Sequence, residues 1–149
     1  MRYFEVVSEQ FRKNPEVEIK LPTRADNGAA GYDFYSPVKL TLMPGDNKLF
    51  FTDIKACMNK DEVLMLYVRS SMGKHPVVIA NGTGIIDSTY YNNISNDGNI
   101  GFRLLNLGTE PYEIDVGDRI GQGVFTKFLT VDNDNTDGIR TGGFGSSGK

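Results

Sequence analysis

Turn signals recur at short intervals along this chain, and they constrain its fold more than any other feature. Asn27-Gly28, Pro44-Gly45-Asp46, Asp97-Gly98-Asn99 and Gly117-Asp118 each combine residues that favour tight turns. Between these turns lie only short apolar or alternating runs. Many short strands separated by turns predict an all-β sandwich or barrel.

The runs between the turns are of two kinds. Residues 63–68 and 77–80 are continuously apolar, as in strands that are buried on both faces. Apolar residues alternate with others at 17–21, 100–104 and 112–116, which is typical of strands with one buried face.

The N-terminal segment fits two local structures. Tyr3, Val7 and Phe11 have helical spacing, but we favour a strand over residues 4–7. Further along, residues 59–62 are expected to form a short turn before the first buried strand.

Composition excludes several classes of function. A chain of 149 residues with 39% hydrophobic residues is expected to form one domain with a sizeable core. Its net charge of −3 does not suggest nucleic-acid binding, and no apolar run approaches the roughly 18 residues that span a membrane. The single cysteine, Cys57, rules out an internal disulfide and suits a reducing compartment, so the cytoplasm is expected. Cys57 and the single histidine, His75, cannot form a zinc site together.

The stretch from Asn81 to Tyr90 is the strongest candidate for a functional site. Its first four residues are small and polar, and their two glycines allow a sharp turn and a close approach to a ligand. Asp87 follows two isoleucines, and a carboxylate held against buried isoleucines loses hydration, as a general base requires. The alternative is an ordinary hairpin with Asp87 in its turn and Tyr90 in the core.

The C-terminal end differs in character from the rest. We expect a β domain over residues 1–131 and a flexible tail over residues 132–149 that closes over the site. The tail is first polar and acidic, and then rich in glycine and serine around Phe144. Such a segment is either a plain flexible end or a flap that folds onto a nucleotide.

Five short segments, taken in order, resemble the five motifs of the trimeric dUTPases. They are Ala29-Ala30-Gly31-Tyr32-Asp33-Phe34, Arg69-Ser70-Ser71-Met72-Gly73, Asn81 through Tyr90, Gly117-Asp118-Arg119-Ile120-Gly121-Gln122, and Gly142-Gly143-Phe144-Gly145-Ser146-Ser147-Gly148. The resemblance covers nearly the whole chain. It implies a jelly-roll-like β fold and a homotrimer whose active sites lie at subunit interfaces, each closed by the tail of another chain. It further implies hydrolysis of dUTP to dUMP and pyrophosphate with Mg²⁺, which limits uracil incorporation into DNA.

The resemblance also assigns roles in the centre of the site. Asp87 matches the aspartate that activates water for attack on the α-phosphate, and Tyr90 matches the ring that packs under the deoxyribose and excludes a 2′-hydroxyl. Asn81 matches a uracil-contacting residue, and the neighbouring backbone at Gly84 and Ile86 is expected to contact the substrate as well. A site built for the edge of uracil rejects cytosine, because its polar groups would be left unpaired.

A second set of residues is matched to the phosphates, the metal and the closing tail. Mg²⁺ is expected to be held by substrate phosphates and water, with Asp33 acting through water and no direct protein ligand. Asp118 and Arg119 are expected to form a structural pair. The remaining matched residues are Arg69, Ser70, Ser71, Gln122 and Arg140 on the phosphates, Phe144 stacked over uracil, and Gly145, Ser146 and Ser147 at the γ-phosphate.

The chain departs from the family pattern in three places. Thr89-Tyr90-Tyr91-Asn92 stands where the family usually has Asp-Tyr-Arg-Gly, and residues 91–97 resemble an insertion, which we expect to be a solvated loop. The spacing from Arg140 to Phe144 is one residue shorter than usual.

Two other functions remain possible on the same fold. A nucleotide-dependent regulatory or binding protein would use the inserted loop for its partner. A dCTP deaminase-like enzyme would rely on a glutamate soon after the third motif, and residues 88–96 contain none.

Overall fold

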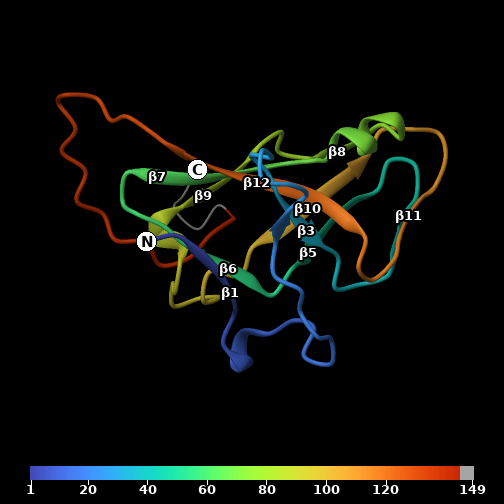
Figure 1. The fold of residues 1–149 in the computed structure, drawn as a ribbon, viewed down its shortest axis with the longest axis horizontal. Helices are drawn as coiled ribbons and strands as arrows, with labels where there is room; N and C mark the ends of the chain where they lie inside the picture. The colour runs from blue at the N-terminus through green and yellow to red at the C-terminus, as the bar shows by residue number, and fades with distance from the viewer. Residues whose placement is uncertain (145–149) are drawn as a thin grey trace.

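The computed structural model describes residues 1–144 of the chain (Figure 1). Over this range it is built from short strands and three single-turn 3₁₀ helices. No helix there is long and apolar enough to cross a membrane. The strands are β1 (Tyr3–Val6), β2 (Thr23–Arg24), β3 (Tyr32–Tyr35), β4 (Leu40–Leu42), β5 (Asn47–Phe51), β6 (Ile54–Cys57), β7 (Glu62–Tyr67), β8 (Val77–Ile79), β9 (Gly84–Asp87), β10 (Gly101–Asn106), β11 (Tyr112–Ile114) and β12 (Arg119–Lys127), and the 3₁₀ helices are η1 (Glu9–Phe11), η2 (Ser70–Lys74) and η3 (Ser88–Tyr90).

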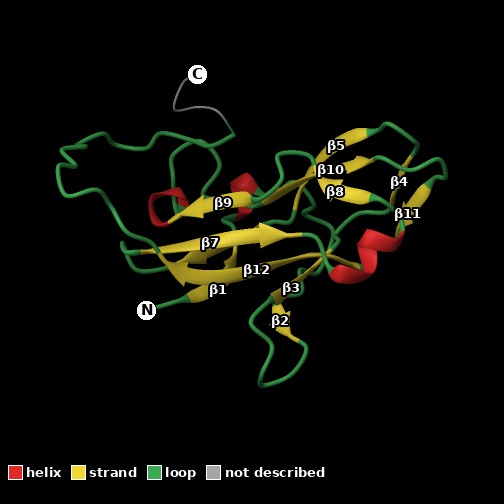
Figure 2. Ribbon diagram, turned by 90° about the horizontal axis from the view of Figure 1, so that it is seen from above, coloured by secondary structure: helices red, strands yellow, loops and turns green. Residues whose placement is uncertain are grey.

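The strands form two main sheets and two small ones, all with antiparallel pairing. The largest has the order β2-β3-β12-β7-β9, and the second has the order β5-β10-β8. Figure 2 shows β7, β9 and β12 lying alongside one another, with β5, β10 and β8 grouped beside them. The pairs β1-β6 and β11-β4 complete the fold. The predicted all-β architecture is confirmed.

The core lies between the two main sheets and is built around aromatic rings. Phe34 of β3 and Phe102 of β10 are buried, with ring centroids 5.4 Å apart. Gly121 of β12 makes this contact possible, because a Cβ atom at that position would lie 2.3 Å from the Phe102 ring. Packing between the sheets therefore requires glycine at position 121, the second glycine of the Gly-Asp-Arg-Ile-Gly segment.

The continuous apolar runs are strands, as predicted. Residues 63–67 fall on β7, which pairs with β12 on one side and β9 on the other, and residues 77–79 fall on β8, so each strand ends one residue before its apolar run does. The alternating run at 17–21 is different, because it forms no strand. Ile19 packs against the core while Leu21 is exposed, so this segment buries part of its apolar surface without pairing with a neighbouring strand.

The N-terminal segment is a strand, as favoured from the sequence. β1 pairs with β6 over residues 3–6, and Phe4 packs against Phe34 at a centroid distance of 5.6 Å. Of the region with helical spacing, only the short η1 forms a helical turn, and Phe11 is its last residue. The expected turn before β7 is also present, since the Glu62 amide donates to the Asn59 carbonyl at 3.1 Å.

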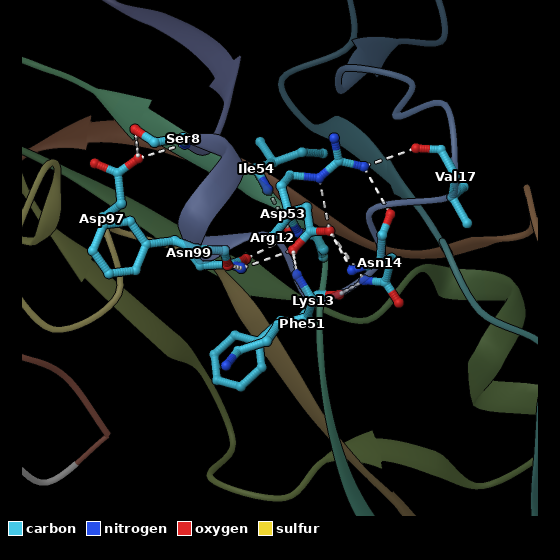
Figure 3. A network of polar contacts seen from close by, with 12 residues as sticks. Ser8, Arg12, Lys13, Asn14, Val17, Phe51, Asp53, Ile54, Asp97 and Asn99 are labelled. Carbon is cyan, nitrogen blue, oxygen red and sulfur yellow. Dashed lines mark hydrogen bonds and ion pairs between the residues drawn. The ribbon is translucent and has the colours of Figure 1, made fainter.

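A buried carboxylate, Asp53, connects this segment to the body of the protein (Figure 3). It accepts hydrogen bonds from the backbone amides of Lys13 (2.8 Å) and Asn14 (2.7 Å), from Arg12 Nε (3.1 Å) and from Asn99 Nδ2 (2.9 Å). Burial alone would raise the pKa of Asp53, but these donors together hold the pKa below its usual value.

Replacing Asp53 by asparagine is expected to lower the free energy of unfolding by about 3 kcal/mol near pH 7, because Arg12 and two amides lose a charged acceptor. The folded-state pKa is depressed, so this contribution is present above the unfolded value of about 3.9 and is lost as the pH falls through the lower folded value. Chemical denaturation at fixed protein concentration measures the difference, which should shrink as the pH falls below about 4.

Asp115→Asn is the matched control for this change. Asp115 pairs with Lys39 at 3.7 Å on the surface, where both side chains are well exposed. The control should change stability by less than about 0.5 kcal/mol. Equal effects of the two substitutions would contradict the structural role of Asp53.

Candidate active site

The glycine-rich stretch Asn81–Gly84 crosses from one main sheet to the other. It joins β8, which pairs with β10, to β9, which pairs with β7, so it is not the hairpin considered from the sequence. Gly82 has φ +81°, and its amide donates to the Ile79 carbonyl at 2.9 Å. A Cβ atom at Gly84 would lie 2.8 Å from Cβ of Leu66, so only glycine fits where β9 begins.

A cavity of ≈ 140 Å³ opens beside this crossing. Its apolar lining includes Leu66, Ile79 and Phe102. An engineered protein cavity of about 150 Å³ binds benzene, so this space suits one six-membered ring. The other lining residues are Asn81, Gly84, Ile85, Ile86, Asp87, Tyr90, Gly101, Arg103, Arg140, Gly143 and Phe144. Arg103 was not singled out from the sequence, because its strand shows only an ordinary alternation.

Asp87 lies at the end of β9, at the edge of the cavity. Its side chain is 45% exposed and Ile85 is 54% exposed, while Ile86 is buried. The expectation that both isoleucines desolvate this carboxylate is therefore wrong. Successive residues of a strand face opposite sides, so Ile86 enters the core while Ile85 and Asp87 face outward.

Tyr90 forms a wall of the same cavity and is only 4% exposed. Its hydroxyl donates to the Asn99 carbonyl at 2.7 Å and accepts from Asn96 Nδ2 at 2.8 Å. Burial raises the pKa of Tyr90, with the Asn96 bond and the charge of Arg140 acting in the opposite direction, so the phenol stays neutral near pH 7.

The C-terminal tail returns to this cavity in its own chain. Figure 1 shows the red segment after β12 running outward and then coming back beside β9. Arg140 forms an ion pair with Asp87, and its Nε donates to Thr89 Oγ1 at 3.1 Å. Gly143 lies so close to Tyr90 that a Cβ atom there would be 2.4 Å from the ring, and Phe144 packs edge-on against Phe51 at 5.7 Å.

A second hollow of ≈ 380 Å³ gathers the other predicted residues. Asp33, Arg69, Ser70 and Gln122 all line it, and Ser70 is exposed at the start of η2. Gly31 makes room for the Gln122 amide, because a Cβ atom at Gly31 would lie 2.2 Å from Gln122 Oε1. Ser71 is exposed on η2 but does not line the hollow.

Asp33 is buried in this hollow and is engaged by two guanidinium groups. It pairs with Arg69 at 2.9 Å and with Arg119 at 3.5 Å. The predicted structural pair of Asp118 and Arg119 is therefore wrong, since the Asp118 carboxylate instead accepts from the Asp115 amide at 2.9 Å. Within residues 1–144, no three His, Cys, Asp or Glu side chains gather into a metal-binding group.

The predicted site residues thus fall into two groups on one chain. Leu66 lines the first cavity and Tyr67 lines the second. The two hollows are lined by separate sets of residues. Gly145, Ser146 and Ser147 lie outside the described residues.

The inserted loop is solvated only in part, since Asn92, Ile94 and Ser95 are exposed while two of its polar residues are buried. Asn93 and Asp97 are each only 7% exposed, and their side chains are hydrogen-bonded within the protein. Asn93 donates to the nearby Tyr90 carbonyl, and Asp97 accepts from Lys55, which is 42 residues away. The polar composition of the loop therefore gave no signal that these two side chains are buried.

Comparison with known proteins agrees with this architecture. A family model described as dUTPase matches residues 17–148. A deoxyuridine 5′-triphosphate nucleotidohydrolase from Lactococcus lactis is 40% identical over 99% of this chain and 98% of that protein, and one from Vaccinia virus is 36% identical over 87% and 86%. The crystal structure of a dUTPase from Streptococcus mutans matches with a TM-score of 0.76 and 35% identity, over 87% of this chain and 98% of that one.

Gly143→Ala is expected to lift the tail from Tyr90, because the added methyl group would overlap the ring. Arg140 should then become more accessible, so trypsin should cleave after Arg140 several-fold faster than in the wild type. Mass spectrometry of the released peptide, residues 141–149, measures the rate. Gly138→Ala is the control, since a Cβ atom there meets nothing within 4 Å. Equal cleavage of both variants would contradict the observed contact.

Proposed function

The chain belongs to the dUTPase family, and from that premise we propose that it hydrolyses dUTP to dUMP and pyrophosphate by water attack on the α-phosphate. The observation that carries this proposal is the position of Asp87, whose carboxylate lies at the edge of a ring-sized cavity between the glycine-rich crossing and Tyr90. This hydrolysis limits uracil incorporation into DNA and supplies dUMP for thymidylate synthesis.

Asp87 is the proposed general base. Its carboxylate accepts a proton from water while the water oxygen bonds to the α-phosphorus, and the bond from that phosphorus to the oxygen bridging to the β-phosphate breaks. The electron pair leaves with pyrophosphate. Arg140 contacts Asp87 within the single chain. In the assembly, Arg140 from the tail of another chain is proposed to bring a cation to the phosphates as their charge shifts toward the leaving group.

The cavity accounts for base and sugar selection. Uracil is a single six-membered ring, which matches a cavity of ≈ 140 Å³, and Asn81 and the backbone at Gly84 and Ile86 provide its polar and close contacts. Tyr90 forms the wall proposed to lie under the deoxyribose, where its ring leaves no room for a 2′-hydroxyl. Phe144 is proposed to stack over the base.

The second hollow is proposed to bind the phosphates. Arg69, Ser70 and Gln122 present a cation, a hydroxyl and an amide there, and Ser71 lies next to them on η2. Gly145, Ser146 and Ser147 of the tail are proposed to complete the contacts to the γ-phosphate.

Mg²⁺ fits this site as a metal that arrives with the substrate. The carboxylate of Asp33 is engaged by Arg69 and Arg119, so Asp33 is suited to act through water rather than as a direct ligand. Mg²⁺ prefers phosphate oxygens and water, and when bound it neutralises phosphate charge.

A homotrimer with shared active sites is proposed as the working form. The two hollows of one chain share no lining residue, and one substrate molecule is proposed to use the first hollow of one copy and the second hollow of another. The tail supports this assembly, because it leaves apolar side chains exposed at Leu129, Val131 and Ile139. In the assembly, the tail of another chain is proposed to close each site.

The alternative functions considered from the sequence are not favoured by the family match. These are a nucleotide-dependent regulatory protein and a dCTP deaminase-like enzyme. For location we propose the cytoplasm, or the infected host cell if the chain is viral, because the single Cys57 suits a reducing compartment.

Asp87→Asn is expected to lower kcat for dUTP by about 10²–10⁴-fold while leaving nucleotide binding in place, because the amide cannot accept the proton. Pyrophosphate release and binding of a non-hydrolysable dUTP analogue measure the two effects. A panel of dUTP, dCTP, dTTP and UTP, each with Mg²⁺ and with chelator, should show metal-dependent turnover of dUTP far above that of the other three. Wild-type turnover by Asp87→Asn would rule out this mechanism.

Mixing two inactive variants tests whether the site is shared. Asp87→Asn and Ser70→Ala damage different hollows, so a mixed assembly contains sites with an intact Asp87 from one chain and an intact Ser70 from another. Random mixing restores about one quarter of the sites, one half times one half. Co-expressed chains should therefore recover pyrophosphate release from dUTP that neither variant shows alone.

If mixed oligomers recover no activity, each chain carries its own complete site.

A further inference from the structure

The hydroxyl of Tyr90 is held from two sides. It donates to the Asn99 carbonyl at 2.7 Å, and it accepts from the side-chain amide of Asn96 at 2.8 Å. A tyrosine ring with an unattached hydroxyl has a broad torsion about χ2. With both bonds in place, the ring of Tyr90 keeps one orientation in the cavity wall.

The orientation of the Asn96 amide is set by its other bonds. Its Oδ1 accepts from Asn93 Nδ2 at 2.7 Å and from the Gly98 amide at 3.0 Å. With the oxygen facing two donors, the Nδ2 group must face Tyr90. The backbone closes tightly around this arrangement, since a Cβ atom at Gly98 would lie 2.8 Å from the Tyr90 carbonyl oxygen.

The loop that carries Asn96 is fixed to the body of the protein. The next residue, Asp97, accepts from the Ser8 amide at 2.7 Å, Ser8 Oγ at 2.8 Å and Lys55 Nζ at 2.9 Å. Lys55 and Asp97 are both buried. Asn96 therefore cannot move away from Tyr90 without breaking a buried, charged cluster.

We propose that Asn96, on the inserted loop, is a positioning residue that sets selectivity for 2′-deoxyribose over ribose by fixing the ring of Tyr90. This rests on the proposed function, in which the Tyr90 ring is the wall beneath the sugar. A displaced ring would leave space for a 2′-hydroxyl, so loss of the Asn96 contact relaxes the rejection of UTP.

The test compares kcat/KM for dUTP with kcat/KM for UTP, in the full-length protein with Mg²⁺. Asn96→Asp keeps an oxygen toward Asn93 and Gly98 but removes the donor toward Tyr90. We expect the dUTP to UTP ratio to fall about five- to tenfold, the equivalent of one hydrogen bond. Asn96→Ala removes all three contacts and should lower the ratio at least as far.

Two controls separate positioning from general loss of structure. Ile94→Ala changes an 80% exposed residue at the same loop and should keep the wild-type ratio. Thermal unfolding of every variant confirms that each is folded at the assay temperature. A loosened loop would lower kcat/KM for both nucleotides equally, so an unchanged ratio in both Asn96 variants overturns the proposal whatever their absolute rates.

A coupled pair of substitutions provides the second measurement. In a Tyr90→Phe background the hydroxyl is absent, so Asn96→Asp should change the ratio by less than about twofold. A full five- to tenfold effect in that background would show that Asn96 acts by another route, and would overturn the proposal.

Tyr90→Leu distinguishes failure of this inference from failure of the sugar-wall role. If Tyr90→Leu lowers the ratio and Asn96→Asp does not, the wall stands and the positioning role of Asn96 is wrong. If neither substitution changes the ratio, Tyr90 is not the wall, and the inference falls with it.

Discussion

The buried carboxylate of Asp53 is the interaction on which the arrangement of the site depends most. A charge in the interior is tolerated only when its lone pairs are satisfied, so Arg12, the amides of Lys13 and Asn14, and the side chain of Asn99 must all be in place. Asn99 then presents its carbonyl to the Tyr90 hydroxyl. The N-terminal residues, which precede the part of the chain matched by the family model, thus reach the cavity through three hydrogen bonds in series.

The candidate site is open to solvent within one chain. Asp87 lies on the outward face of β9 with its side chain 45% exposed, so the single chain does not provide the water-free surroundings that make a carboxylate an effective base. The missing cover must come from the substrate, the tail and, in the proposed assembly, a second copy. The same strand geometry that exposes Asp87 sends Ile86 into the core, where it fixes the position of β9.

Local sequence signals predicted the parts of the fold that depend on local interactions. The apolar run of β7 and the turn expected at residues 59–62 place this inner strand correctly, and the five motifs locate residues that the fold gathers into two hollows. Two failures involve partners that are distant in the sequence, whereas the exposure of Asp87 follows from the local alternation of β9. Asp33 and Arg119, 86 residues apart, form an ion pair that no local pattern indicates. Likewise, Asp97 is buried because Ser8 and Lys55 lie beside it, and its polar neighbours suggested the opposite.

The departures from the family pattern are related by their positions around Tyr90. Thr89 stands where the family has an acid, and its hydroxyl still accepts a hydrogen bond from Arg140 at 3.1 Å. Arg140 reaches Asp87 at the same time, although the segment to Phe144 is one residue shorter than usual, because Gly143 allows the backbone to lie directly against the Tyr90 ring. On the other side of that ring, Asn96 of the inserted loop bonds the hydroxyl. The changed third motif, the insertion and the shortened tail therefore meet around one side chain, because Asn96 and Gly143 contact Tyr90 directly and Thr89 contacts the Arg140 of the same tail.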